Sequence, residues 1–174
     1  MHGQIPAVDL GNGVTSVNMG QPGLEWNQVP LSENITTLEL PIEGTPTATG
    51  MGNPHCTFFV EDAEKINLAV MGPKFENHPL FPERTNVQFA SISASDQIRM
   101  RVWERGVGVT LASGSSSCAT AVAANRRGLT GKKVQIELDG GILNINWRED
   151  GVWMTGPTMN VFAGSFSEEF LNSL

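Results

Sequence analysis

The chain has 174 residues, of which 40% are hydrophobic and 17% are charged, and its formal net charge is -7 at pH 7. This is the composition of a globular protein with one respectable core, and it excludes a disordered chain. The acidic excess argues against nucleic-acid binding, which needs clustered Lys and Arg, because the only adjacent basic residues are Arg126-Arg127 and Lys132-Lys133.

The sequence also constrains the cellular location and the metal content of the protein. No apolar run approaches the roughly 20 residues that cross a bilayer, and residues 1–4 do not resemble a signal peptide, so we expect a cytoplasmic protein with no membrane partner. Two cysteines, Cys56 and Cys118, make no disulfide framework in a chain of this length. His55-Cys56 is too small a group for a zinc site, so we expect buried thiols in a reducing compartment and no metal.

In the first half of the chain, short apolar runs alternate with loops rich in glycine and proline. Strands are predicted at residues 14–19, 36–42 and 56–60, with a turn at 50–54. Residues 62–71 fit a short helix, because Asp62 can cap it and Ala63, Ile66 and Val70 share one face. Prolines then predict a loop over residues 72–84.

The next two predicted strands cover residues 85–91 and 97–104. The second of them alternates in side-chain character, with Ile98, Met100 and Val102 between Arg99, Arg101 and Trp103. This is the pattern of a half-buried strand, so we expect core packing on one side of it only.

Residues 115–127 give the clearest helix prediction. Three serines suit its N-terminus, Arg126 and Arg127 lie at its negative end, and Gly128 stops it. Its middle is small and apolar nearly all round, so we expect the sheet to enclose it. Further strands are predicted at residues 133–138, 142–148, 152–155 and 161–166, with hairpin turns at 139–141 and 149–151. Mostly strands around one central helix predict an α+β domain.

One stretch combines a polar turn with the start of this helix. Trp103-Glu104-Arg105-Gly106-Val107-Gly108 leads through an apolar run into Ser113-Gly114-Ser115-Ser116. The glycines allow the backbone to approach a ligand closely, and free amides at a helix start favour an anion such as a carboxylate. The same spacing also fits an ordinary strand–loop–helix connection, in which Glu104-Arg105 is a surface pair of little energetic value.

Two further turns have the same ambiguity. Gly52-Asn53-Pro54-His55 opens a strand, but a lone Asn in such a turn usually caps its own backbone, and a lone histidine is usually structural. Phe81-Pro82-Glu83-Arg84-Thr85-Asn86 is a second polar turn of this kind. Neither turn alone indicates a function.

Taken together, the three stretches resemble the successive signature blocks of the diaminopimelate epimerase family, in family order and at family-like separations. Asn77-His78-Pro79 and Val152-Trp153-Met154-Thr155-Gly156-Pro157 are similar to the family too, and the resemblance covers residues 14–166. It implies one half of a pseudo-symmetric two-domain fold, in which a curved, mixed or antiparallel sheet wraps around a central helix. The domain would comprise residues 14–166, with 1–13 as the crossover between domains and 167–174 as a tail.

The resemblance also implies an activity and a set of site residues. The family interconverts LL- and meso-diaminopimelate in lysine biosynthesis, without cofactor or metal, using two cysteines on opposite faces of the substrate. Positions that match its substrate-holding residues are Asn53, Asn86 and Arg105 for the distal carboxylate, Glu104 for the distal amino group, and Gly114 and Ser115 for the reacting carboxylate. His55 and Glu104 match positions that support catalysis.

The family pattern breaks at Ser113, which stands at the position of a catalytic cysteine. A cysteine has a reference pKa of ~8.5 that a helix N-terminus lowers, whereas an alkoxide does not form near neutral pH without a strong base beside it. We therefore expect Ser113 to be at most a weak proton donor. Cys118 lies more than one helical turn away and matches a non-catalytic cysteine of the family.

A second departure is that the family's first half, with the other catalytic cysteine, has no counterpart in this chain. We therefore expect the chain alone to be inactive. Three explanations stay open: a fragment of a longer product, a half-size protein that forms a homodimer or binds a partner to imitate the two-domain molecule, or a module that binds a diaminopimelate-like amino acid without catalysis. Proline racemases and phenazine-biosynthesis isomerases share the architecture, so a related substrate also stays open.

Overall fold

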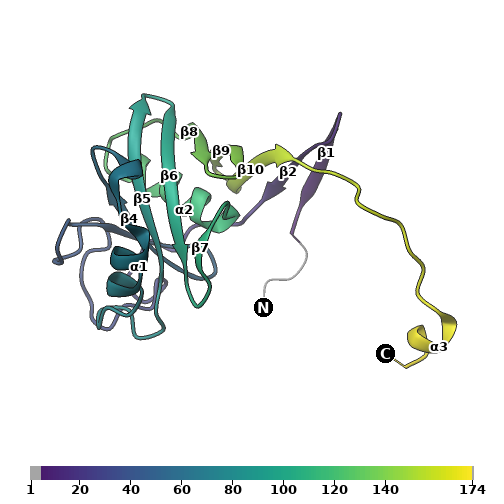
Figure 1. Ribbon diagram of the computed structural model, residues 1–174, viewed down its shortest axis with the longest axis horizontal. Coiled ribbons are helices and arrows are strands. Elements are labelled where there is room, and N and C mark those ends of the chain that lie inside the picture. The colour runs from purple at the N-terminus through teal and green to yellow at the C-terminus, as the bar shows by residue number, and fades with distance from the viewer. Residues whose placement is uncertain (1–4, 174) are drawn as a thin grey trace.

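The computed structural model describes residues 5–173. Its body is a curved, open sheet of ten strands that wraps around one helix (Figure 1). The strands are β1 (Ala7–Gly11), β2 (Val14–Asn18), β3 (Thr47–Gly50), β4 (Pro54–Phe59), β5 (Asn86–Ala94), β6 (Gln97–Glu104), β7 (Gly108–Thr110), β8 (Lys133–Leu138), β9 (Gly141–Arg148) and β10 (Gly151–Pro157). The predicted α+β class, with a curved mixed sheet around a helix, is confirmed.

The sheet is mixed in strand direction. Its order is β1-β2-β10-β9-β8-β6-β5-β4-β3, and β7 pairs with β6 off this path. Only β4–β5 and β6–β8 are parallel among the described pairs. Parallel neighbours need a long crossover, and here the crossovers carry the helices: η1 (Ala63–Lys65) and α1 (Leu68–Glu76) after β4, and α2 (Gly114–Arg126) after β6.

Alternation along the central strands divides the core between α2 and α1. On β6, Ile98, Met100 and Val102 are buried in the cluster around α2, as the sequence pattern predicts, while Trp103 packs with the α1 cluster. On β4 and β5, the residues that pack with the α1 cluster are Cys56, Phe58, Val87 and Phe89. Because successive side chains point to opposite faces, the intervening polar residues face α2: His55, Thr57, Asn86 and Gln88.

The central helix α2 begins and ends one residue before the predicted 115–127. Its residues 116–124 are all buried, and the helix contacts six strands: β3, β4, β5, β8, β9 and β10. Small side chains such as Ala119 and Ala123 allow this close approach from several sides. Fully buried Val122 and the Val, Ile and Met side chains of the surrounding strands then stabilise the fold by about 1.5–3 kcal/mol each.

Two predicted elements in the first half of the chain are wrong. Residues 36–42 form bends instead of a strand. Two backbone hydrogen bonds nevertheless join this segment to β3 and the residues before it: one joins Thr37 to a residue in β3, and the other joins Leu40 to a residue just before β3. The helix predicted at 62–71 is split into η1 and α1, and α1 runs through Pro73 into the predicted loop. Burial of Phe75, together with the hydrogen bonds that Glu76 accepts from Trp103 and Gly106, outweighs the cost of an internal proline.

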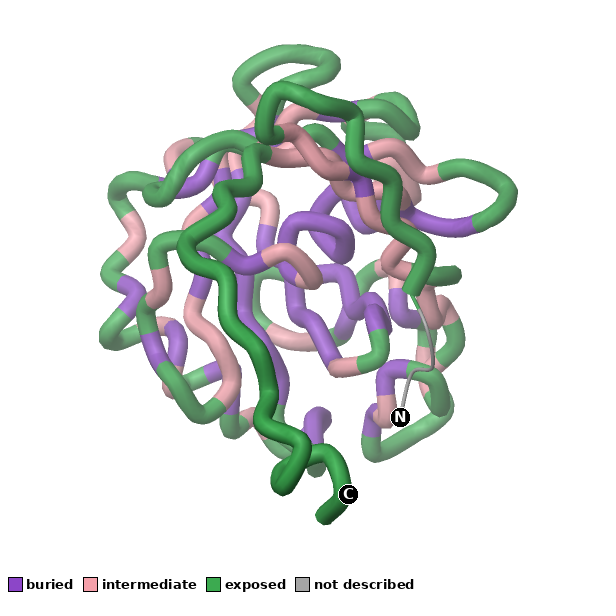
Figure 2. The backbone as a smooth tube through the Cα atoms, turned by 90° about the vertical axis from the view of Figure 1, so that its right-hand side faces the viewer, coloured by how far each residue is buried: buried purple, intermediate pink, exposed green. Residues whose placement is uncertain are grey.

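The two ends of the described chain project from this body (Figure 1). β1 is an exposed edge strand that the sequence did not predict. The strand predicted at 161–166 is also wrong, because residues 158–167 have no regular structure and lie exposed before α3 (Glu168–Leu171) (Figure 2). Within residues 5–173, no helix has the length and apolar character needed to span a membrane.

Candidate functional site

The predicted site residues meet at one edge of the sheet, where β4 and β5 begin and β6 ends. Asn53 lies in the turn before β4, and His55 on β4 is in register with Asn86, the first residue of β5. Antiparallel β6 returns to the same edge and ends at Glu104. Ser113, directly before α2, reaches Glu104 through a hydrogen bond. Strand direction therefore gathers residues that are up to 60 positions apart in the sequence.

Ser113 is the N-cap residue of α2, but its side chain makes no capping hydrogen bond. Its Oγ lies 3.0 Å from Glu104 Oε2 and 3.0 Å from Ser116 Oγ. A hydroxyl has one proton and a carboxylate only accepts, so Ser113 donates to Glu104 and Ser116 supplies the second bond. Thr110 Oγ1 donates to the other Glu104 oxygen at 2.7 Å, which fixes the carboxylate.

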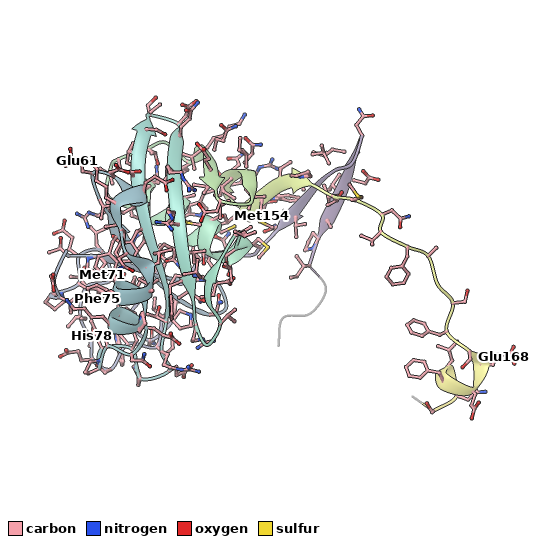
Figure 3. The ribbon with its side chains drawn as sticks, viewed as in Figure 1. Glu61, Met71, Phe75, His78, Met154 and Glu168 are labelled. Carbon is pink, nitrogen blue, oxygen red and sulfur yellow. The ribbon has the colours of Figure 1, made fainter. Side chains whose placement is uncertain are left out.

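The consequence is an uncapped helix start beside Ser113. The first amides of an α-helix have no intrahelical acceptor, and here the N-cap side chain does not bind them either. Those of Gly114 and Ser115 can therefore bind an anion, aided by the positive end of the helix dipole. Met154 on β10, labelled in Figure 3, lies against this start, with its Sδ 2.9 Å from where a Gly114 Cβ would be.

His55 is fully buried, with both ring nitrogens occupied. Nε2 lies 2.8 Å from Asn53 Oδ1 and Nδ1 lies 3.0 Å from Gln88 Nε2. Because Asn53 Oδ1 can only accept, Nε2 carries the proton and Nδ1 accepts from Gln88. Burial, and then the positive charge of Arg105, lowers the pKa of His55 to about 3. The imidazole is therefore neutral, and its Nε2–H group holds the Asn53 amide through Oδ1.

Gln88 and Ser116 belong to the same polar cluster, and sequence reasoning missed both. Gln88 is fully buried; its Oε1 accepts from Thr57 Oγ1 at 3.1 Å, and its Nε2 also donates to Ser116 Oγ at 3.0 Å. An unpaired buried amide would cost roughly 1–3 kcal/mol, so these bonds make the glutamine tolerable. The available signal was a polar residue on the α2-facing side of β5, between the apolar Val87 and Phe89.

Asn86 links two turns of the site. Its Nδ2 donates to Pro54 O at 3.0 Å, and its Oδ1 accepts from the backbone amide of Arg105 at 3.0 Å. One Nδ2 proton is left for a ligand. Arg105 uses one guanidinium nitrogen to donate to Glu83 O at 3.0 Å, and its other N–H groups remain available. Donors and the Glu104 acceptor thus lie side by side at this edge.

The two cysteines are not reactive in this setting. Both are buried, and burial raises the pKa of Cys56 and brings that of Cys118 to about 12. Neither thiol therefore forms a thiolate near neutral pH. Across residues 5–173, no group of three His, Cys, Asp or Glu side chains is placed to hold a metal ion.

A surface hollow of about 420 Å³ lies beside the end of α1, lined by residues that include Glu43, Lys74, Phe75 and His78; Figure 3 labels Phe75 and His78. It shares no residue with the site. Two of the charged side chains that line it, Lys74 and Glu43, are already paired with each other. We therefore assign the candidate site to the polar edge and not to this hollow.

Two solved structures share the fold over most of this chain. A predicted epimerase from Pseudomonas aeruginosa superposes with a TM-score of 0.58 at 16% identity, over 88% of this chain and 58% of that one. A hydroxyproline epimerase from Agrobacterium vitis superposes with a TM-score of 0.55 at 12% identity, over 83% of this chain and 50% of that one. At such identities the likeness concerns the fold alone.

Sequence comparison identifies the family. The model of the diaminopimelate epimerase family matches residues 47–161. Diaminopimelate epimerases from Rhodospirillum centenum and Acidiphilium cryptum are 53% and 48% identical to the chain, over 92% and 97% of its length. The chain belongs to the diaminopimelate epimerase family. It spans 57% and 63% of the length of these two relatives.

Proposed function

We propose that this chain is the part of a diaminopimelate epimerase that holds the substrate, and that on its own it binds diaminopimelate or a close analogue without inverting it. The observation that carries the proposal is the uncapped start of α2, where Ser113 donates to Glu104 and leaves the amides of Gly114 and Ser115 to a ligand.

The order of charges along the site supports a ligand with a carboxylate at each end. The α2 amides suit the reacting α-carboxylate, and Glu104 suits an amino group. Asn53, Asn86 and Arg105 supply N–H donors for the distal carboxylate, in agreement with the family resemblance. Neutralising the α-carboxylate would also lower the cost of carbanion character at the adjacent carbon, which proton abstraction requires.

Among the described residues, the uncapped start of α2 has no suitable base beside it for that abstraction. The Ser113 hydroxyl faces the Glu104 carboxylate at 3.0 Å, and a carboxylate is too weak a base to convert a hydroxyl to an alkoxide near neutral pH. The negative charge of Glu104 also disfavours an alkoxide. Cys56 and Cys118 cannot substitute for the missing thiol, because both are buried away from the uncapped helix start with raised pKa values.

His55 acts through Asn53 in this proposal. Its ring nitrogens are both occupied by side chains of the chain itself, so it contributes by holding the Asn53 amide with its Nδ2 toward the ligand. A neutral histidine also avoids repelling the amino groups of the substrate.

The test is a titration of the purified 174-residue chain with meso-diaminopimelate, followed by amide NMR shifts. We expect the Gly114 and Ser115 amides to shift, and Arg105→Ala to weaken binding about tenfold or more, since a hydrogen bond to a charged group contributes roughly 1.5–3 kcal/mol.

Arg127→Ala is the matched control, because it removes the same charge at the opposite end of α2, where Arg127 donates to Thr45 O. The affinity of the Arg127→Ala variant for meso-diaminopimelate should equal that of the unaltered chain. Binding that is unaffected by Arg105→Ala, or that leaves the two amides unshifted, would show that the proposed site is wrong.

A further inference from the structure

Glu76, the last residue of α1, is a buried carboxylate outside the residues that the proposed function uses. It accepts a hydrogen bond from the Trp103 indole nitrogen at 2.6 Å, from the Gly106 backbone amide at 2.8 Å and from Arg84 at 3.2 Å. Arg84 is about half exposed, so the other two donors, which lie on either side of Glu104-Arg105 in partly buried hydrogen bonds, are the distinctive partners.

The Gly106 amide belongs to the turn that presents Arg105. Val107 N donates to Glu104 O at 3.0 Å, which closes a four-residue turn with Arg105 and Gly106 at its centre. Gly106 has φ 75°, the left-handed conformation that the third position of a type II turn requires. The two central amides of such a turn have no partner within it, and here Asn86 binds one and Glu76 binds the other.

The Glu76 carboxylate is itself held in place by Trp103. The indole packs on α1 at Gly72, where an added Cβ would lie 2.3 Å from a ring atom. Helix and strand are therefore in direct contact, and the indole N–H reaches the end of the helix. A shift of Glu76 would have to move either Trp103, next to Glu104 in the sequence, or the turn that follows it.

We infer that Glu76 is a positioning residue of the site: its carboxylate fixes the turn at residues 104–107 and thereby the direction in which Arg105 and Glu104 meet a ligand. It touches no ligand itself. A carboxylate is required because it accepts through both oxygens. A glutamine would present an N–H group to one of the two donors, and that donor would lose its partner.

The ligand-binding part of this inference rests on the proposed function, and its test uses Glu76→Gln in the full chain. NMR should show displaced signals for the Gly106 amide, the Trp103 indole N–H and the Arg105 amide before any ligand is added. With meso-diaminopimelate we expect about tenfold weaker binding. The control Glu43→Gln removes an exposed carboxylate that pairs with Lys74 and should change neither readout.

A double-mutant cycle separates positioning from a general loss of structure. If Glu76 acts through Arg105, Glu76→Gln costs about tenfold in the unaltered chain and little in the Arg105→Ala background. Equal losses in both backgrounds would overturn the inference, as would unchanged signals for Gly106 and Arg105. If the unaltered chain binds no diaminopimelate, the proposed function fails, and the ligand-free NMR comparison still decides whether Glu76 fixes the turn.

Trp103→Phe covers the case in which Glu76→Gln does not fold. It removes the indole donor and keeps the carboxylate, so one Glu76 oxygen loses its partner. The Gly106 amide signal should therefore move, and the part of diaminopimelate binding that depends on Arg105 should weaken. A Gly106 signal and an affinity that both stay at the values of the unaltered chain would contradict the role of Glu76.

Discussion

Ser113 begins α2 without capping it, because its hydroxyl donates to Glu104. A serine at this position normally binds an amide of its own helix and contributes about 1 kcal/mol by doing so. Here that stabilisation is absent and the amides stay available. We expect the same geometry with a cysteine at residue 113, where the side chain would add an acid that can ionise close to neutral pH.

His55 gives a prediction about pH. Its folded-state pKa of about 3 lies below the ordinary value of 6.5, so the unfolded chain takes up a proton first as the pH falls. The stability that His55 contributes is complete above pH 6.5 and is lost progressively between pH 6.5 and pH 3. At pH 4.5 the loss should be about 2–3 kcal/mol in the free energy of unfolding.

Urea unfolding at pH 7 and pH 4.5 measures this loss. His55→Gln should remove the part of the stability loss between pH 7 and pH 4.5 that His55 causes. His78→Gln, which replaces a histidine outside the cluster, should leave that loss unchanged. The same decrease in the His55→Gln variant as in the unaltered chain would mean that another group is responsible.

At the scale of elements, the contact between α1 and β6 decides how well the site is supported. We predict that Gly72→Ala destabilises the chain by about 3 kcal/mol, because its Cβ would overlap the Trp103 indole and force the helix off the strand. Tryptophan fluorescence and chemical denaturation would measure this. Gly131→Ala is the control, since a Cβ there meets nothing within 4 Å; equal stability of the two variants would refute the packing argument.

Sequence reasoning located the strands whose side chains alternate or whose turns are glycine-rich. Strands β6 and β8 have the predicted bounds, and β9, β10 and α2 lie within two residues of theirs. Prediction from the sequence failed where tertiary contacts outweigh the local preference of the residues for a helix, strand or loop. Pro73 predicts a loop, yet α1 continues to bury Phe75 and Glu76. The apolar residues at 161–166 predict a strand, yet no described strand pairs with them.

The candidate site was predictable only in part. The resemblance supplied the residues that match known positions, and the structure brings these to one sheet edge. Gln88, Ser116 and Glu76 were not predicted, because their roles depend on which face of a strand or helix they occupy and on distant pairings such as Gln88–Ser116 and Trp103–Glu76, which are 28 and 27 residues apart. A local pattern does not encode such pairings. The residue roles carried over from the family stay predictions.

At the scale of the whole molecule, the site lies on a domain that spans 57% and 63% of the length of two relatives. Inversion at a carbon by two acids needs one on each face of the substrate. The described residues supply donors and one carboxylate on one side, with a hydroxyl at residue 113. We therefore propose that the chain orients a substrate and leaves the α-proton in place.

The most direct test joins an N-terminal half from a family member, with its own cysteine, to this chain and follows α-proton exchange of diaminopimelate in deuterated water. We predict negligible exchange with Ser113, and exchange at a rate at least a thousandfold higher, an order-of-magnitude figure for general-base catalysis, after Ser113→Cys. Full-rate exchange with Ser113 in place, in material free of contaminating enzyme, would contradict the account.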